Sequence, residues 1–182
     1  GSITTLTFSS DGRILAAGNV ERNIKLFDST SANVIHTFAG HSGMITTLAF
    51  SPDSKTLASG SVDKAIMLWD VVAGNSLQTL RSHPEKITAI VFSRDDKNVA
   101  SASVDGTIKI WKPGTWREQQ GIKGRPGVLA LAFTSDSSSL LAATADNILG
   151  RWSVQTGRRG PDPAAPIDTN ALQAIAIVFS SD

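Results

Sequence analysis

The chain has no cysteine among its 182 residues, which excludes a disulfide framework, a thiolate metal site and a cysteine nucleophile. Only three histidines are present, so little remains for a histidine metal centre. No apolar run approaches the roughly 18 residues that a membrane-spanning helix needs. We therefore expect no membrane association, and a cytoplasmic location is compatible with this composition.

An excess of charge of one sign is also missing. The formal net charge is +1, and the composition is ordinary, with 41% apolar and 18% charged residues. This balance gives no strong signal for nucleic-acid or membrane partners. The sequence also lacks a glycine-rich phosphate loop, a zincin-type histidine pair, an EF-hand pattern and a glycosylation sequon. We expect no cofactor and no metal.

What the sequence does contain is an internal repeat. A phenylalanine followed three residues later by aspartate begins at Phe8, Phe50, Phe92, Phe133 and Phe179, with spacings of 42, 42, 41 and 46 residues. A second aromatic landmark follows 19 residues after each of the first four, at Phe27, Trp69, Trp111 and Trp152. A period of 40–45 residues indicates stacked copies of one supersecondary unit.

The second repeat shows the pattern of one copy. Apolar or β-prone runs occupy residues 44–50, 56–61, 66–69 and 76–80, and short turn sequences separate them. No stretch has a sustained helical period. The pattern predicts four short antiparallel strands per repeat in an all-β protein. The expected repeats are about 1–40, 41–82, 83–123 and 124–160, within a single domain over 1–182.

Two consecutive repeats carry further landmarks in register. A histidine lies 22 residues before an aspartate, and a tryptophan ends the third strand: His41, Asp63 and Trp69, then His83, Asp105 and Trp111. This set closely resembles the WD-repeat family of β-propellers, over essentially the whole chain. The resemblance implies four-stranded antiparallel blades around a central axis, with the first strand of each blade innermost.

The first and fourth repeats depart from the family pattern. Glu21 and Phe27 replace the expected aspartate and tryptophan, and Arg125 stands where histidine is expected. Arg151 occupies a third-strand position that is leucine or isoleucine in the other repeats. A charge there is unfavourable unless it is paired or reaches solvent. We expect a bulge, an exposed blade face or a carboxylate partner at Arg151.

Histidine, serine and aspartate recur in fixed order, which permits two interpretations. A catalytic triad would use serine as the nucleophile. The family resemblance instead implies a buried hydrogen-bond network in which aspartate accepts from histidine and serine links histidine to the indole. Repetition favours the structural role, because catalysis needs one site whereas each blade needs a brace. The predicted network residues are His41, Ser59, Asp63, Trp69, His83, Ser101, Asp105 and Trp111.

The resemblance also places charged and apolar residues in turns at one end of the blades. The candidate partner-binding residues are Arg22, Met44, Lys64, Glu85, Lys86 and Arg125. The function expected is a non-catalytic protein–protein interaction scaffold or sensor module. The alternative is a hydrolase-like propeller enzyme with its site in the central channel.

The chain carries first strands near both of its ends but only four sets of the other three strands. We expect a long loop over 157–173 and an extra first strand over 174–182. Four blades should leave an open arc with exposed apolar faces. We therefore expect the rest of a longer chain, or a second copy, to complete the propeller.

Overall fold

The computed structural model describes residues 1–81, 83–146 and 148–161. Fifteen β-strands and no helix occur within these residues. The strands are β1 Ile3–Phe8, β2 Ile14–Asn19, β3 Asn23–Asp28, β4 Val34–Ala39, β5 Ile45–Phe50, β6 Thr56–Ser61, β7 Ile66–Asp70, β8 Asn75–Leu80, β9 Ile87–Phe92, β10 Val99–Ser103, β11 Thr107–Lys112, β12 Arg117–Lys123, β13 Val128–Phe133, β14 Ser139–Thr144 and β15 Leu149–Ser153.

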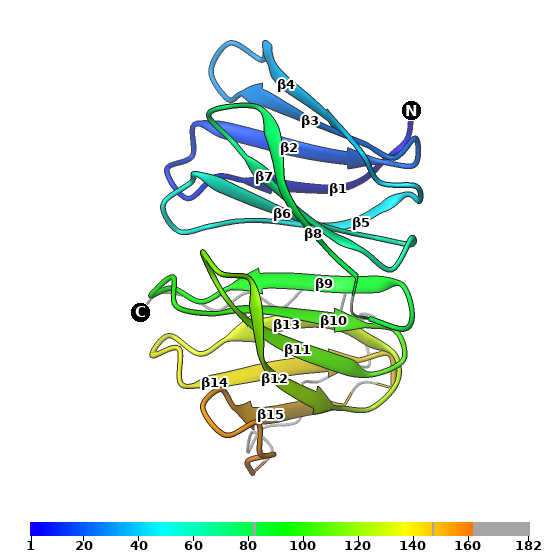
Figure 1. The fold of residues 1–182 in the computed structure, drawn as a ribbon, viewed down its shortest axis with the longest axis vertical. Coiled ribbons are helices and arrows are strands. Elements are labelled where there is room, and N and C mark those ends of the chain that lie inside the picture. The colour runs from blue at the N-terminus through cyan, green and yellow to red at the C-terminus, as the bar shows by residue number, and fades with distance from the viewer. Residues whose placement is uncertain (82, 147, 162–182) are drawn as a thin grey trace. The chain divides into compact units, whose positions relative to one another are not determined.

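Each sheet is built from strands that are consecutive in the chain (Figure 1). The described residues form sheets β1-β2-β3-β4, β5-β6-β7-β8, β12-β11-β10-β9 and β13-β14-β15, which we call blades 1 to 4. The all-β architecture of antiparallel blades is therefore confirmed. The chain divides into two compact units, residues 1–90 and 91–182, and the division falls inside β9. We describe each unit by itself.

The fourth blade has a short substitute for a fourth strand. Trp152 pairs with Arg159 in an isolated antiparallel bridge, and the Gly160 N–H donates to the Arg151 carbonyl at 2.9 Å. The loop expected over 157–173 thus begins as a segment lying beside β15. Its residues from 162 onward, and the extra first strand expected over 174–182, lie outside the described residues.

The core of the N-terminal unit comes mainly from the inner strands. It includes the buried side chains Ala16, Ile24, Leu26, Phe38, Ile45, Leu57 and Trp69. Both faces of β6 are buried apart from its first residue, and small residues fill the middle of that strand. Strands covered on both faces read as continuous small or apolar runs rather than as alternating ones. This explains why the repeat was visible in the sequence.

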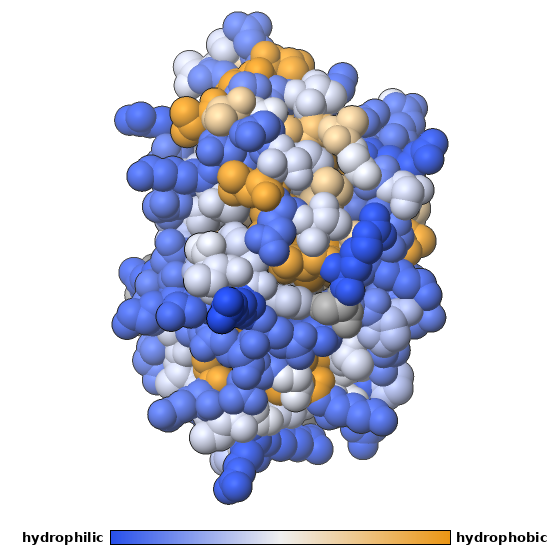
Figure 2. Space-filling model, in the orientation of Figure 1, coloured by the Kyte–Doolittle hydropathy of each residue, from blue (hydrophilic) through white to orange (hydrophobic). Residues whose placement is uncertain are grey.

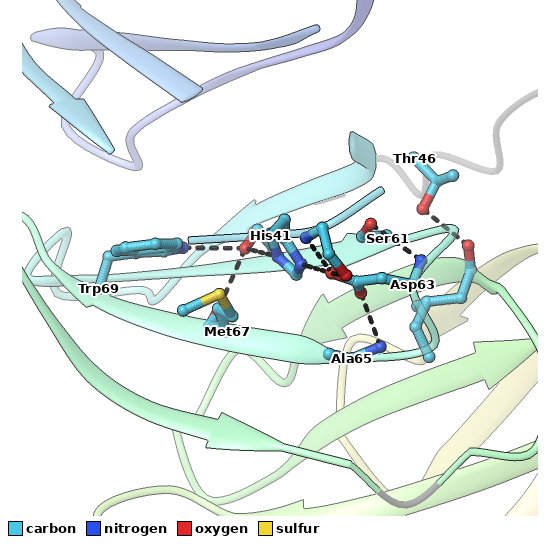
Figure 3. Close-up of polar contacts among 10 residues, drawn as sticks. His41, Thr46, Ser61, Asp63, Ala65, Met67 and Trp69 are labelled. Atoms are coloured by element: carbon cyan, nitrogen blue, oxygen red, sulfur yellow. Dashed lines mark hydrogen bonds and ion pairs between the residues drawn. The ribbon is translucent and has the colours of Figure 1, made fainter. Parts of the chain in front are cut away.

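Blades 1 and 2 meet at a joint that recurs in the chain. A Cβ atom at Gly18 would lie 2.6 Å from Ile45 Cγ2, so only glycine leaves room for the next blade's isoleucine. Beside it, the Thr4 hydroxyl donates to the Ile45 carbonyl at 2.6 Å. The same joint forms 42 residues later, where the Thr46 hydroxyl donates to the Ile87 carbonyl at 2.7 Å (Figure 3).

In each of the four described blades, the repeated phenylalanine–aspartate motif forms a turn held by side-chain hydrogen bonds after the first strand. The Ser51 hydroxyl donates to Asp53 Oδ1 at 2.6 Å, and Asp53 Oδ1 also accepts the Lys55 N–H at 3.0 Å. Ser51 Oγ in turn accepts the Thr56 N–H at 2.9 Å. The hydroxyl–aspartate bond recurs at residues 9 and 11, 93 and 95, and 134 and 136. The repeated phenylalanine–aspartate motif therefore marks a turn that its own serine or threonine and aspartate side chains stabilise.

Candidate functional site

His41, Ser59, Asp63 and Trp69 form one hydrogen-bonded network inside blade 2 (Figure 3). His41 Nδ1 lies 2.9 Å from Asp63 Oδ2, and because a carboxylate only accepts, Nδ1 carries the proton. His41 Nε2 lies 2.8 Å from Ser59 Oγ. Ser59 Oγ also accepts the Trp69 indole N–H at 2.8 Å. The network joins the loop before β5 to β6 and β7.

The distances in this network match those of a serine–histidine–aspartate catalytic triad, but the serine hydroxyl is not accessible to a substrate. Ser59 is fully buried, and His41 and Trp69 are nearly so. A nucleophilic hydroxyl must meet its substrate. Ser59 Oγ is instead enclosed by the blade, where it accepts the indole N–H. The geometry therefore suits a structural tie between strands.

Asp63 is held in its charged form. Burial by itself raises the pKa of Asp63, but hydrogen bonds donated by the Ala65 N–H, the His41 ring and the Ser42 N–H outweigh it. The pKa of this carboxyl is therefore lowered from its ordinary value. The Ser42 N–H lies 2.7 Å from Asp63 Oδ2, and the Ala65 N–H lies 3.0 Å from Oδ1.

Blade 3 repeats part of this arrangement. The Trp111 indole N–H donates to Ser101 Oγ at 2.9 Å, and both side chains are buried. Asp105 Oδ1 accepts the backbone N–H of Thr107 at 3.0 Å and its hydroxyl at 2.8 Å. His83 is buried as well. The structure thus joins serine to tryptophan in the two repeats that carry the full motif.

Blade 4 replaces the histidine–aspartate contact by an exposed ion pair. Arg125, at the position of His41, donates from Nη1 to Asp146 Oδ2 at 3.2 Å. More than half of each side chain's surface is exposed, so the pair adds little stability. Ala142 stands where Ser59 stands in blade 2, in the same register with the third strand.

Of the three expectations for Arg151, only solvent exposure is met, and only in part. The β14–β15 register is regular, so there is no bulge, and no carboxylate in the described part of the chain pairs with it. Its Nε instead donates to the Ser139 hydroxyl at 3.1 Å, and the side chain is half-buried. A hydroxyl partner and partial solvent access satisfy the guanidinium in place of an ion pair.

All six predicted partner-binding residues are exposed or half-exposed side chains of loops and turns. In an antiparallel blade, the turn after the second strand lies at the same end as the loop that enters the first strand. The Lys64 ammonium pairs with Glu85 Oε1 at 3.1 Å, and the Val62 N–H donates to the Met44 carbonyl at 3.1 Å. Met44, Lys64 and Glu85 therefore come together in the N-terminal unit.

In that unit, Arg22 occupies in blade 1 the turn position that Lys64 has in blade 2. Lys86 occupies before β9 the position that Met44 has before β5. Arg22 is in the turn between β2 and β3, and Lys86 directly precedes β9. Arg125 belongs to the C-terminal unit, where it pairs with Asp146. The described contacts thus bring together Met44, Lys64 and Glu85, while Arg22 and Lys86 share their blade end only by their place in the chain.

Two of these residues have a backbone conformation that the sequence did not reveal. Arg22 and Lys64 have φ angles of 71° and 69°, in the left-handed region that favours glycine. The matching turn of blade 3 has Gly106, with φ of 91°. Long basic side chains thus stand where glycine would fit with less strain. Ala32, Ser54, Asp96, Trp116 and Ser137 also have left-handed φ angles, so the long basic side chains are what set Arg22 and Lys64 apart.

Trp116 occupies the turn before β12. It is half-buried and has φ of 52°, and its ring meets Phe92 edge-on with centroids 6.4 Å apart. The packing on Phe92 shows what holds this side chain in a left-handed turn. Trp116 therefore lies against its own blade.

Comparison with known proteins identifies the family. A model described as the WD domain, G-beta repeat matches residues 32–70 and 74–112. A second model, described as the anaphase-promoting complex subunit 4 WD40 domain, matches residues 1–46. The chain belongs to the WD-repeat family of β-propellers. No curated protein matches it.

WD-repeat domains generally mediate protein–protein interactions and are typically non-catalytic. Within residues 1–81, 83–146 and 148–161, no group of three or more histidine, aspartate or glutamate side chains is placed to hold a metal ion. None of the described segments is a helix of the length and apolarity needed to cross a membrane.

Proposed function

We propose that this chain is a non-catalytic interaction module that binds protein partners through the loops and turns at one end of its blades. The observation that carries the proposal is the conformation of Arg22 and Lys64. Both keep a basic side chain in a turn where Gly106 shows that glycine fits. The surface would consist of Arg22, Met44, Lys64, Glu85 and Lys86, with Arg125 as a separate candidate in the C-terminal unit.

The burial of Ser59 speaks against the alternative of a hydrolase-like enzyme. Its hydroxyl has the right distance to His41 but no route to solvent. The match of residues 1–46 to a model named for a subunit of a complex supports an interaction role instead. We assign the histidine networks to holding the blades rigid, so that the loops are presented in a fixed arrangement.

Photo-crosslinking tests the binding end. A crosslinking amino acid at Met44, which is 41% exposed, should capture a partner protein from the native cell extract. The same amino acid at Lys55, in the turn at the opposite end of blade 2, should not. Lys64→Gly should abolish the capture at position 44. Its thermal stability should be unchanged or slightly higher, because relieved left-handed strain offsets the added freedom of glycine in the unfolded chain.

Ser54→Gly is the matched control, because Ser54 has φ of 61° and lies in the β5–β6 turn at the opposite end. It makes the same kind of backbone change away from the proposed surface. Equal capture at positions 44 and 55, or equal loss of capture in the two glycine variants, would contradict the assignment.

A further blade is the second partner that we propose, supplied either by a longer chain or by a second copy. It would cover the outer face of β1, which carries three exposed apolar side chains, Ile3, Leu6 and Phe8. The corresponding side chains of β5 pack against blade 1. The outer face of β1 thus carries the same kind of apolar side chains that are buried between blades 1 and 2.

A further inference from the structure

A cavity of about 360 Å³ lies in the C-terminal unit, between β12 and the second and third strands of blade 4. It is lined by Ile122, Lys123, Arg125, Thr144, Gly150 and Trp152, among other residues. This volume is at the lower end of the range for ligand pockets and suits a single side chain or a short segment. Only Arg125 of this set was singled out from the sequence as a binding candidate.

The cavity lies where blade 2 is filled. Phe38, paired with Ile24, stacks on Trp69 with ring centroids 4.8 Å apart. Ile122 occupies the same register position in β12, paired with Ile108, and it is smaller. Ile122 therefore fills less of the space beside Trp152 than Phe38 fills beside Trp69.

Three further replacements change the surroundings of Trp152. Gly150 stands where Met67 stands, and the Trp152 ring takes up the space above it, because a Cβ atom at Gly150 would clash with Trp152 Cη2. Ala142 replaces the serine that accepts the indole N–H in blades 2 and 3. Arg125 replaces the buried histidine but extends to the exposed Asp146. Blade 4 therefore lacks the histidine and the serine of the blade 2 network, and the cavity lies beside the tryptophan that remains.

The chemistry of the cavity is aromatic and basic. Trp152 is 7% exposed, and within the described part of the chain its indole N–H has no acceptor. The rim carries the cations Lys123, Arg125 and Arg159. The acid beside Arg125 is Asp146, and it is already engaged by Arg125 and by the Thr144 hydroxyl. Lys123 forms no ion pair within the described residues.

We propose that this cavity is a binding site for a carboxylate side chain carried on an acidic segment of a partner protein. The rim cations attract the anion, and charge-assisted hydrogen bonds from Lys123 and the indole N–H hold the carboxylate. The aliphatic part of a glutamate side chain packs against Trp152 and Ile122. The inference extends the proposed interaction role to a second site and does not depend on the loops of the N-terminal unit.

The test follows the tryptophan indole N–H signals of the whole ¹⁵N-labelled chain by NMR. Trp152→Phe identifies the Trp152 signal by its absence. A short capped oligoglutamate should shift that signal saturably, and the matched oligoglutamine should not. The signals of Trp69 and Trp111 should stay in place, because their indoles are already bonded to Ser59 and Ser101.

Two variants locate the contacts. Lys123→Gln should weaken oligoglutamate binding about tenfold, the effect of one charge-assisted hydrogen bond. Ala142→Ser should weaken it too, since the new hydroxyl takes the indole N–H as Ser59 does, and its melting temperature should not fall. Arg22→Gln, in the other unit, should leave this binding unchanged.

Several outcomes overturn the proposal. These are a Trp152 signal that does not move at millimolar oligoglutamate, an equal shift with oligoglutamine, and unaltered affinity in both Lys123→Gln and Ala142→Ser. A shift with an oligophosphoserine peptide alone would overturn the carboxylate assignment. Each result is independent of the crosslinking at Met44, so failure here is distinct from failure of the proposed loop surface.

Discussion

At the scale of the residue, Ser59 is where a catalytic and a structural role make opposite predictions. Ser59→Ala removes the acceptor of the Trp69 indole N–H and the partner of His41 Nε2, both buried. We expect the free energy of unfolding to fall by about 1–3 kcal/mol, as for other stranded buried polar groups. Urea unfolding measures this.

The exposed Ser76 in β8 provides the control for that loss. Ser76→Ala should change the free energy of unfolding by less than about 0.5 kcal/mol. A fluorophosphonate probe should label neither the native chain nor Ser59→Ala. Labelling that disappears in Ser59→Ala while stability stays unchanged would support the enzyme instead.

The turn aspartates make stability depend on acid pH. The Thr134 hydroxyl, with the hydroxyl and N–H of Ser138, lowers the pKa of Asp136 from 3.8 to about 2. A carboxyl with a lowered pKa in the folded state contributes stability above its unfolded value and loses it as pH falls through its folded value. The loss should therefore run from about pH 4 to about pH 2.

Asp11, Asp53 and Asp95 have lowered pKa values for the same reason, chiefly a serine hydroxyl two residues earlier. They add to the loss in the same direction. Unfolding free energy against pH measures it, and Asp136→Asn should flatten the slope between about pH 4 and 2. A slope that stays the same in Asp136→Asn would show that this turn is not locked in solution.

At the scale of the element, blade 4 differs from blade 2 chiefly in lacking its internal network. Ala142 is fully buried, and its register with Gly150 is that of Ser59 with Met67. Ala142→Ser should therefore create the missing bond to Trp152 and raise the free energy of unfolding by about 1 kcal/mol. Thermal and urea unfolding measure the change.

A double-mutant cycle isolates that bond. In the Trp152→Phe background the indole N–H is absent, so Ala142→Ser should bring no gain and should instead destabilise by burying an unpaired hydroxyl. An equal gain in both backgrounds would mean that the introduced hydroxyl stabilises the strand without contacting Trp152.

At the scale of the whole molecule, exposed apolar surface is unevenly distributed. Ile3, Leu6 and Phe8 are 60%, 55% and 59% exposed, whereas Ile45, Leu48 and Phe50 are 0%, 7% and 8% exposed. All the large exposed apolar side chains of the described residues except Leu129 belong to residues 1–90. Figure 2 shows more hydrophobic surface, in orange, over this N-terminal unit.

Light scattering tests whether another blade covers the β1 face. If a second copy covers it, the 182-residue chain should have twice the mass of its 19.2 kDa monomer, and Leu6→Lys should return it to the monomer. If a longer chain supplies the blade, the isolated chain should be monomeric and bind an apolar dye, and Leu6→Lys should abolish the dye signal. A monomer that binds no dye would contradict the proposal.

The blades and their turns were predictable from the sequence because their causes are local. A strand buried on both faces must be apolar or small, and a turn that locks itself needs serine and aspartate two residues apart, as at Ser51 and Asp53. These requirements recur with each blade, so the sequence repeats at spacings of 42, 42, 41 and 46 residues because the blade repeats. The histidine, aspartate and tryptophan positions followed from the family resemblance.

Tertiary structure decided between roles that the sequence had left open. Ser59 is buried, which favours a structural role over that of a nucleophile. Arg125 extends to Asp146 rather than into the blade. The cavity beside Trp152 is lined by Ile122 of β12, Thr144 of β14 and Gly150 of β15, which come from three strands. Packing depends on the summed volume of side chains that are distant in sequence, and no local spacing records that sum.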